Sequence, residues 1–401
     1  MIWQKKFADD YHKNFDTMLL LTFILIAIGL IFKRPLLFAI VGLFLTYMCM
    51  HSLYDRNIGK YLSIHNVKET IRLFPGDAST LRIVFENRSI LPYMNGKLRF
   101  QLDNAVYANE RVVDNKQNMT VYEMPLSIIG RTQTVVEIPI QAKKRGLVRI
   151  SKITYTFPHL FNFASVELTY TPFYRTEYIV FPALEHMSGM KRQWQIIFGE
   201  QVTHISPFED MLSPIGTRVY HLNDPFHRIN WKATAKTGQL QTNVYEKNID
   251  QSYLIIVNLE AIDAFDFSRI TQNMEHLLSC ATYLSEYLTK NNLPYEIAVN
   301  GRILGDVPFF HIPKDHGSIH YAKTLEMLAR IPSQPLLLPF PILLNYLKQR
   351  ILYMRTIVII GEIPKNVYDI LHQWRLYNRQ ILHVGYEQDR GVIRSWGEGA
   401  C

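Results

Sequence analysis

The pattern of apolar and polar positions changes several times along the chain. Residues 1–16 are largely polar, and two charge-free apolar stretches follow, 17–32 and 36–50. Each approaches the roughly 20 residues that an α-helix needs to cross the hydrocarbon of a membrane. No small-residue cleavage site follows the first stretch, which disfavours a signal peptide, and the other alternative is a buried soluble helical hairpin. We therefore predict a transmembrane helical hairpin over residues 1–60.

The charges around the apolar stretches predict which side of the membrane the rest of the chain occupies. Lys33 and Arg34 lie in the turn of the hairpin. More cations lie outside the turn, and they are Lys5, Lys6, Lys13, Arg56 and Lys60. Because cytoplasmic loops carry an excess of Lys and Arg, both ends of the hairpin are predicted to be cytoplasmic, together with everything after residue 60.

Residues 61–175 show a different pattern, in which short alternating segments are separated by turn residues. Residues 81–87 and 134–140 alternate apolar with polar positions, and Asn95-Gly96 is a typical turn pair. Several short strands at regular spacing favour an antiparallel β-sandwich domain. Residues 176–250 then form a connector.

From residue 251 the pattern favours a doubly wound α/β domain, which extends to residue 401. Residues 253–257 and 356–361 are near-continuous apolar runs, typical of strands that are buried on both faces. Residues 267–290 place apolar side chains at helical spacing and predict a long helix. Strands of this type alternating with helices indicate a sheet covered on both faces. The whole chain is thus predicted to be a multidomain α+β protein.

The connector contains the densest group of chemically distinctive side chains, at 216–236. Asp224 followed by Pro225 predicts the start of a helix, with Gly238 just past its end. The distinctive positions are Gly216, Arg218, Tyr220, Asp224, Arg228, Trp231 and Lys232. The cations Arg218, Arg228 and Lys232 could bind a phosphate or a partner's carboxylate, but we favour pairs with Asp or Glu that tie the connector to the α/β domain. Trp231 is interpreted as a packing anchor.

These residues resemble the signature of a bacterial membrane-associated family known as domain-of-unknown-function family 58. Its members carry G-x-R-x-Y, then a G-D pair, then R-x-I-x-W-K-x-x-A-[RK]. This sequence has Asn223 where the family has Gly, and Phe157-Pro-His-Leu-Phe161 where relatives have D-P-F-G-L-F. The resemblance implies a location at the bacterial cell membrane and a MoxR-type AAA+ ATPase as partner. Because some relatives also occur with a transglutaminase-like membrane protein, the resemblance implies such a protein as a second possible partner.

The C-terminal part also resembles the von Willebrand factor A-type fold that follows this signature in many relatives. That fold often binds a divalent metal through Asp-x-Ser-x-Ser at the end of its first strand. The corresponding residues here are Asn258, Glu260 and Ile262. Because a hard cation prefers carboxylate and hydroxyl oxygens, this degenerate site is predicted to hold no metal.

Composition and motifs narrow the function classes that remain. The net charge of +8 is dispersed along the chain, and such a dispersed charge argues against nucleic-acid binding. No sequence motif for a cofactor or for a catalytic nucleophile occurs. We therefore predict a non-enzymatic, membrane-anchored adaptor that works with the ATPase in assembly or maturation of envelope proteins. One alternative is a hydrolase that uses His221, Asp224 and His227. The other is a metal-dependent ligand-binding A domain.

Overall fold

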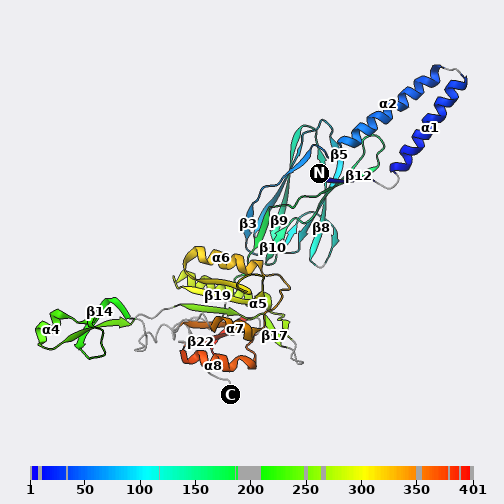
Figure 1. Ribbon diagram of the computed structural model, residues 1–401. Coiled ribbons are helices and arrows are strands. Elements are labelled where there is room, and N and C mark those ends of the chain that lie inside the picture. Colours follow the sequence, from blue (N-terminus) through cyan, green and yellow to red (C-terminus); the bar gives the residue numbers. More distant parts are fainter. Residues whose placement is uncertain are drawn as a thin grey trace. The chain divides into compact units, whose positions relative to one another are not determined.

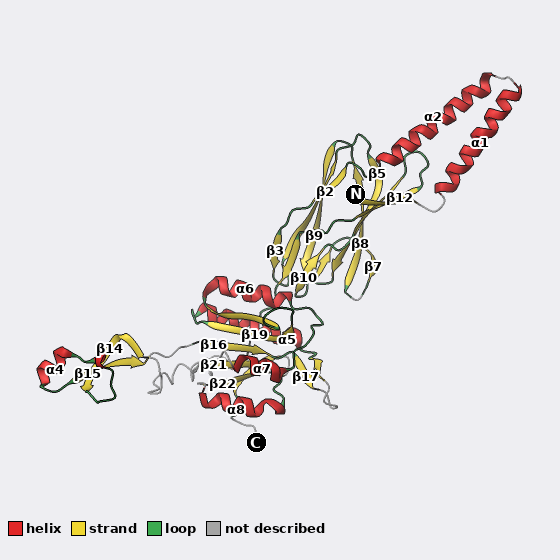
Figure 2. Ribbon diagram, in the orientation of Figure 1, coloured by secondary structure: helices red, strands yellow, loops and turns green. Residues whose placement is uncertain are grey.

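The structure is a computed structural model that separates into two compact units, Met1–Phe181 and Pro182–Cys401. It is a mixed α+β structure rich in antiparallel sheets, as predicted (Figures 1 and 2). The residues that it describes are 2–7, 11–32, 35–116, 118–185, 187, 209–247, 252–262, 268–348, 355–377, 380–387 and 390–397.

Antiparallel strands build most of the first unit. One sheet has the order β1-β12-β11-β5-β8-β7, and another has the order β2-β4-β9-β6. The first sheet consists of β1 (Trp3–Phe7), β12 (Ser165–Tyr170), β11 (Ile153–Pro158), β5 (Tyr93–Asp103), β8 (Met119–Ile128) and β7 (Arg111–Asn115). The second consists of β2 (Leu62–His65), β4 (Ala78–Asn87), β9 (Thr132–Ala142) and β6 (Val106–Ala108).

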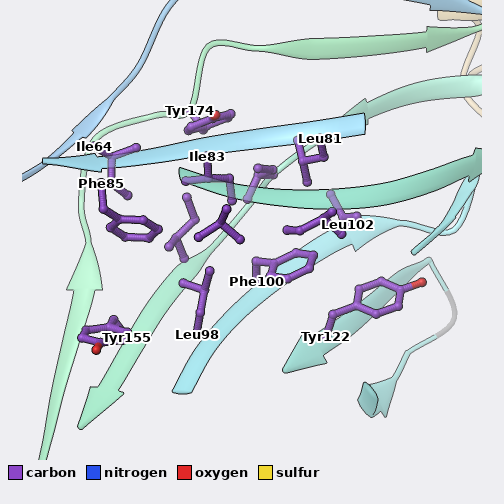
Figure 3. Close-up of a cluster of buried hydrophobic side chains, with 14 of the residues drawn as sticks. Ile64, Leu81, Ile83, Phe85, Leu98, Phe100, Leu102, Tyr122, Tyr155 and Tyr174 are labelled. Atoms are coloured by element: carbon purple, nitrogen blue, oxygen red, sulfur yellow. The ribbon is translucent and has the colours of Figure 1, made fainter. Parts of the chain in front are cut away.

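The alternating pattern gives each of these sheets one buried face. Leu81, Ile83 and Phe85 of β4 are almost fully buried, and so are Leu98 and Phe100 of β5. All of them belong to one hydrophobic core, and Figure 3 shows the side chains of β4 facing those of β5. Burial of one such side chain contributes roughly 1.5–3 kcal/mol to folding, so this shared core holds the two sheets together.

The first unit extends beyond the predicted β-domain at both ends. Strand β1, in the N-terminal segment, pairs with β12, so that Trp3 lies opposite Tyr170. A third sheet has the order β10-β13-β3, in which β13 pairs antiparallel with β10 and parallel with β3. These strands are β10 (Gly146–Arg149), β13 (Glu177–Val180) and β3 (Thr70–Leu73). Strand β13 was predicted as part of the connector, but its pairing places it in the first unit.

Helices α1 (Tyr11–Phe32) and α2 (Pro35–Asn57) lie side by side in Figures 1 and 2. Thr22 of α1 and Met48 of α2 approach to 3.7 Å between Oγ1 and Sδ. In the described part of the chain, Leu36–Asn57 is long and apolar enough to span a membrane, whereas Thr17–Ile31 is a shorter apolar helix. The pair of helices is therefore present, and its crossing of a membrane, once or twice, stays a prediction.

A mixed sheet with the order β20-β19-β16-β21-β22-β23 forms the centre of the second unit. Its inner strands are parallel, as predicted, but β20 and β23 are antiparallel to their neighbours. The strands are β20 (Phe309–Asp315), β19 (Tyr295–Arg302), β16 (Tyr253–Val257), β21 (Thr356–Ile360), β22 (Gln380–Glu387) and β23 (Arg390–Ser395). The sheet is therefore not a purely parallel one.

Helices cover both faces of this sheet, because alternate residues of β16 enter two different cores. Ile255 packs in the core that includes α5 and α6, and Leu254 packs in the core that includes α7 and α8. The helices are α5 (Met274–Lys290), α6 (Gly317–Arg330), α7 (Phe340–Lys348) and α8 (Tyr368–Tyr377). The helix predicted from residue 267 begins only at Met274, since β18 (Ser268–Ile270) pairs with β17 (Glu260–Ile262).

Candidate functional site

The signature residues fold into a hairpin with a short helix, which we call the signature arm (residues 209–247, green in Figure 1). Strand β14 (Glu209–Val219) pairs antiparallel with β15 (Gln241–Lys247). The connection between them contains the 3₁₀-helix η1 (Phe226–Arg228) and the helix α4 (Trp231–Thr237). Strand β15 therefore follows the helix directly.

The helix of the arm begins later than predicted. Asn230, not Asp224, is the N-cap, and its Oδ1 accepts a hydrogen bond from the backbone N–H of Ala233 at 2.9 Å. Ile229 is extended and forms a β-bridge with Thr242, which separates η1 from α4. Gly238 ends the helix in the left-handed conformation, with φ of 70°, as its position predicts.

Asp224 instead forms an ion pair inside the arm. The Arg218 guanidinium donates from Nη1 to Oδ2 at 2.7 Å and from Nη2 to Oδ1 at 2.6 Å. The backbone N–H of His221 donates to Oδ2 at 2.9 Å, and the Tyr220 hydroxyl donates to the Asp224 carbonyl at 3.0 Å. Hydrogen bonds from Arg218 and then from His221 lower the pKa of Asp224 to about 2. Arg218 thus pairs inside the arm with the residue predicted to cap the helix, whereas the sequence predicted a pair that ties the connector to the α/β domain.

The remaining signature residues lie in strand β14, in η1 and in the first turn of α4. Gly216 pairs with Val244 beside an irregularity in the hairpin register. The Arg228 guanidinium lies 5.7 Å from the centre of the Tyr245 ring, within the range of a cation–π contact. Trp231 and Lys232 are exposed at the start of α4. Trp231 was interpreted as a packing anchor, and its exposed fraction of 64% disagrees with that interpretation.

The hydrolase alternative requires His221, Asp224 and His227 to act together. Both histidines are exposed. In a catalytic triad the carboxylate accepts a hydrogen bond from the imidazole and orients it. Here the contacts of the Asp224 oxygens come from the Arg218 side chain and from the His221 backbone. This arrangement suits a structural carboxylate better than a catalytic one.

Large apolar side chains lie on the outside of the signature arm. Leu222 is 97% exposed, Phe226 is 72% exposed and Trp231 is 64% exposed. Val219 and Leu240 are also exposed. Where exposed apolar side chains form a contiguous patch, the patch commonly binds other molecules. The polar signature residues thus stabilise the arm, while its apolar residues remain available for contact.

The degenerate metal-site positions lie at the carboxyl edge of the parallel strands. Asn258 Oδ1 accepts hydrogen bonds from Asn300 Nδ2 at 2.7 Å and from the Glu260 backbone at 3.1 Å. Its Nδ2 donates to the Glu362 carbonyl at 2.7 Å, and Glu260 Oε2 accepts from the Phe340 backbone at 2.8 Å. These oxygens accept hydrogen bonds within the fold, and the absence of a metal at these positions stays a prediction. The Ile262 side chain lies outside the described residues.

A polar cavity of about 690 Å³ adjoins this edge of the sheet. Glu260, Glu362, Lys365 and Tyr368 contribute to its lining. Lys365 belongs to η2 (Lys365–Val367), the 3₁₀-helix just before α8. Open α/β sheets commonly bind ligands outside the carboxyl ends of their strands, so this cavity is a second candidate site.

The structure also brings together three side chains that the sequence analysis did not connect. His51 and Asp55 lie one turn apart on α2, and His159 follows β11 in the Phe157–Phe161 turn. His159 Nε2 lies 2.8 Å from Asp55 Oδ1, and His51 Nδ1 lies 3.4 Å from Asp55 Oδ2. We call these three residues the anchor clamp. The departure from the family's turn sequence at His159 was the signal that could have pointed to it.

Histidine and aspartate are metal ligands, and the candidate ligand atoms of the clamp all lie within 4.8 Å of one another. The hydrogen bonds do not fit a metal site, however. The backbone N–H of Phe161 donates to His159 Nδ1 at 3.3 Å, so the neutral ring carries its proton on Nε2, the atom that faces Asp55. A metal would need a lone pair on that same atom. The clamp is therefore a hydrogen-bonded junction between α2 and the sheets.

Comparison with known proteins gives no family for this chain, since neither a family model nor a curated protein matches it. A non-cellulosomal cohesin from Archaeoglobus fulgidus is 8% identical, with 35% of this chain and 99% of that chain covered at a TM-score of 0.20. Spo0M, a sporulation control protein from Bacillus subtilis, is 9% identical over 30% of this chain and 49% of that chain, at a TM-score of 0.18. A β-glucosidase from Listeria innocua is 8% identical over 30% of this chain and 16% of that chain, also at 0.18. The chain thus spans less than half the length of these last two proteins, and similarities this slight carry no argument.

Proposed function

We propose that this chain is a non-enzymatic adaptor, anchored in a bacterial cell membrane, whose folded domains bind other proteins in the cytoplasm. Its parts would be a transmembrane hairpin, a β-sandwich, the signature arm and a von Willebrand factor A-like domain. The observation that carries the binding role is the arrangement of the signature arm. Arg218 and Asp224 are paired with each other, whereas Leu222, Phe226 and Trp231 are exposed.

The anchoring role is supported by the way the helices join the sheets. Strand β1 precedes α1 and pairs with β12, and α2 leads back to the same unit through the anchor clamp. Both ends of the helix pair therefore lie at the sheets, as a hairpin inserted from one side requires. A cleavable signal sequence would have no need of these buried contacts. Many large apolar side chains of α1 and α2 are exposed, which suits contact with lipid.

The partner class comes from the family resemblance. Relatives of the resembled family occur with a MoxR-type AAA+ ATPase and sometimes with a transglutaminase-like membrane protein. An adaptor for ATPase-driven assembly or maturation of envelope proteins would need a membrane anchor and an exposed binding surface. The candidate membrane span would serve as the anchor, and the exposed apolar residues of the signature arm would serve as the binding surface.

The anchor and its orientation can be tested by cell fractionation. The full chain is expected in the membrane fraction after carbonate extraction, which removes peripheral proteins. Protease added outside intact spheroplasts should leave the C-terminal unit undigested, whereas protease added to inverted vesicles should digest it. Release by carbonate would contradict the anchor, and digestion from outside would contradict the cytoplasmic orientation.

The binding role can be tested by pull-down from detergent-solubilised membranes, with and without ATP. The variant Leu222→Ser, Phe226→Ser, Trp231→Ser should lose the ATPase that the unchanged chain retains. A matched control is Leu304→Ser, Ile319→Ser, Leu376→Ser, whose side chains are 100%, 74% and 81% exposed outside the arm. This control should retain the ATPase. Equal binding by both variants would contradict a role for the arm.

A further inference from the structure

A cavity of about 360 Å³ lies where helix α2 ends, in the first unit. It is large enough for a small ligand group, since ligand cavities begin at roughly 300 Å³. Its lining combines apolar with cationic side chains, and the residues used below are Ile2, Trp3, Lys5, Arg56, Ile58 and Lys60. This combination suits a ligand with an anionic group next to apolar atoms.

Buried contacts fix the apolar walls of the cavity. Trp3 is 3% exposed, and its indole N–H donates to the Leu62 carbonyl at 2.7 Å. Ile58 is fully buried. Gly59 has a φ of 72°, and a Cβ there would lie 3.3 Å from Leu168 and 3.6 Å from the Trp3 Cβ. The turn after α2 therefore holds Trp3 close, and the walls are formed before any ligand binds.

The cations at the cavity come from two separate segments of the chain. Lys5 lies on β1, where its ammonium donates to the Asp55 carbonyl at 2.9 Å. Burial lowers the pKa of Lys5, while the charge of Asp55 acts in the opposite direction. Arg56 and Lys60 are exposed, at the end of α2 and just after it. The Asp55 carboxylate lies 2.8 Å from His159 Nε2, and its charge also acts on Lys5.

We propose that this cavity binds the headgroup of an anionic phospholipid. The candidate membrane span ends at Asn57, so the cavity lies at headgroup level if α2 crosses the bilayer as proposed above. Lys5, Arg56 and Lys60 bind the phosphate, because ammonium and guanidinium groups form charge-assisted hydrogen bonds with phosphate oxygens. The exposed Ile2 contacts the apolar atoms next to it, while the buried Trp3 and Ile58 support this wall from behind. Several cations are needed, since the C-terminal end of α2 itself repels an anion.

The proposal predicts selective retention of anionic lipid by the full chain. The protein is purified in detergent that contains equal amounts of phosphatidylglycerol and phosphatidylcholine, and bound lipid is counted by native mass spectrometry. The unchanged chain should retain phosphatidylglycerol in an excess of at least about fivefold. The variant Lys5→Gln, Arg56→Gln, Lys60→Gln should retain the two lipids almost equally. The control Lys68→Gln, Lys143→Gln, Lys144→Gln, which alters exposed lysines of the same unit, should keep the excess.

Further measurements distinguish a lipid headgroup from free phosphate as the bound anion. They also distinguish failure of the lipid proposal from failure of the membrane anchor. The charge-preserving variant Lys5→Arg, Arg56→Lys, Lys60→Arg should keep most of the excess, which separates loss of charge from misfolding. An excess that persists in the glutamine variant would overturn the proposal, and so would its removal by added inorganic phosphate, which would assign the cavity to free phosphate. A chain that is released by carbonate but shows the predicted lipid retention would contradict the membrane anchor and support the cavity.

Discussion

His159 Nε2 lies 2.8 Å from Asp55 Oδ1, across a sequence separation of 104 residues. The contact joins the end of a candidate membrane span to a turn between two strands of the sheet unit. His159 is fully buried, and its other ring nitrogen accepts the Phe161 N–H. The orientation of the ring is thus fixed from both sides, so the junction between helix and sheets is specific.

Replacing His159 by Leu should destabilise the first unit. The change leaves the Asp55 carboxylate without one buried donor, and such losses cost roughly 2–4 kcal/mol. The free energy of unfolding can be obtained from hydrogen exchange of β11 peptides in the detergent-solubilised full chain. His65→Leu, at an exposed histidine of β2, is the control and should have little effect. Equal exchange in both variants would show that the clamp contributes nothing.

A buried ionic triad in the second unit gives a larger predicted effect. Glu296 accepts from Arg355 Nη1 at 2.6 Å and contacts His311 Nε2 at 2.7 Å. Glu296→Gln should cost about 3–5 kcal/mol, because Arg355 would be left buried without its counter-charge. Glu296→Leu combined with Arg355→Met should be less destabilising than Glu296→Gln. Chemical denaturation monitored by hydrogen exchange of β19 peptides gives the free energy of unfolding of both variants. A double variant that is destabilised as much as Glu296→Gln would contradict this account.

The same triad predicts a pH dependence. Burial raises the pKa of Glu296, but hydrogen bonds from His311 and Arg355 outweigh it, and the pKa lies below its usual value of 4.5. A carboxyl whose pKa is lowered by folding stabilises the protein above the unfolded pKa, and this contribution is lost as the pH falls through the folded value. The stability difference between the unchanged chain and Glu296→Gln should therefore be full at neutral pH and decrease as the pH falls below this usual value of 4.5. A difference that grows in acid would contradict the sign.

Gly361 should not tolerate a side chain. Its φ is 109°, and a Cβ there would lie 2.3 Å from the Asn258 carbonyl oxygen. Gly361→Ala should lower the stability of the second unit by at least about 2 kcal/mol, since the strained backbone and the contact with a backbone atom add. Thermal unfolding of the full chain measures it. Gly385→Ala is the matched control, because its Cβ would meet its nearest neighbour at 3.6 Å, and it should change little.

The ion pair of the signature arm should be visible in the titration of Asp224. Arg218→Gln removes the main cause of the lowered pKa, so the value should rise from about 2 toward 3.8. The carboxyl carbon can be followed by NMR in the full chain with labelled aspartate, and Asp224→Asn assigns the signal. Lys232→Gln, an exposed cation on the same arm, should leave the titration unchanged. An unshifted Asp224 in the Arg218 variant would show that another group holds its pKa low.

Several elements could be predicted because their signal is local. The alternation in residues 81–87 gives strand β4, and the apolar run 253–257 gives the fully buried strand β16. Gly238 ends α4 because glycine tolerates the left-handed conformation. Each of these elements depends on residues within a few positions of one another, so its pattern can be recognised in the sequence alone.

Other features were missed because their partners are distant in sequence. The five residues of β1 become a strand by pairing with β12, more than a hundred residues later. The helix of the arm begins at Asn230 because Ile229 is held extended by its bridge to Thr242, although Asp224-Pro225 has a favourable sequence for a helix start. The local propensity is outweighed in both cases by contacts that form only on folding.

The sequence by itself determined where the apolar helices, the alternating strands and the buried parallel strands lie, because side-chain periodicity acts over one or two turns of the chain. The tertiary structure alone decided that β1 and β13 join the first unit, that Asp224 pairs with Arg218 instead of capping a helix, and that His51, Asp55 and His159 meet. Most of these contacts, such as β1 with β12 and Asp55 with His159, join residues that are far apart along the chain, and the pair of Arg218 with Asp224 depends on how the arm folds. Their energy depends on burial and direction, which exist only once the sheets and helices have packed.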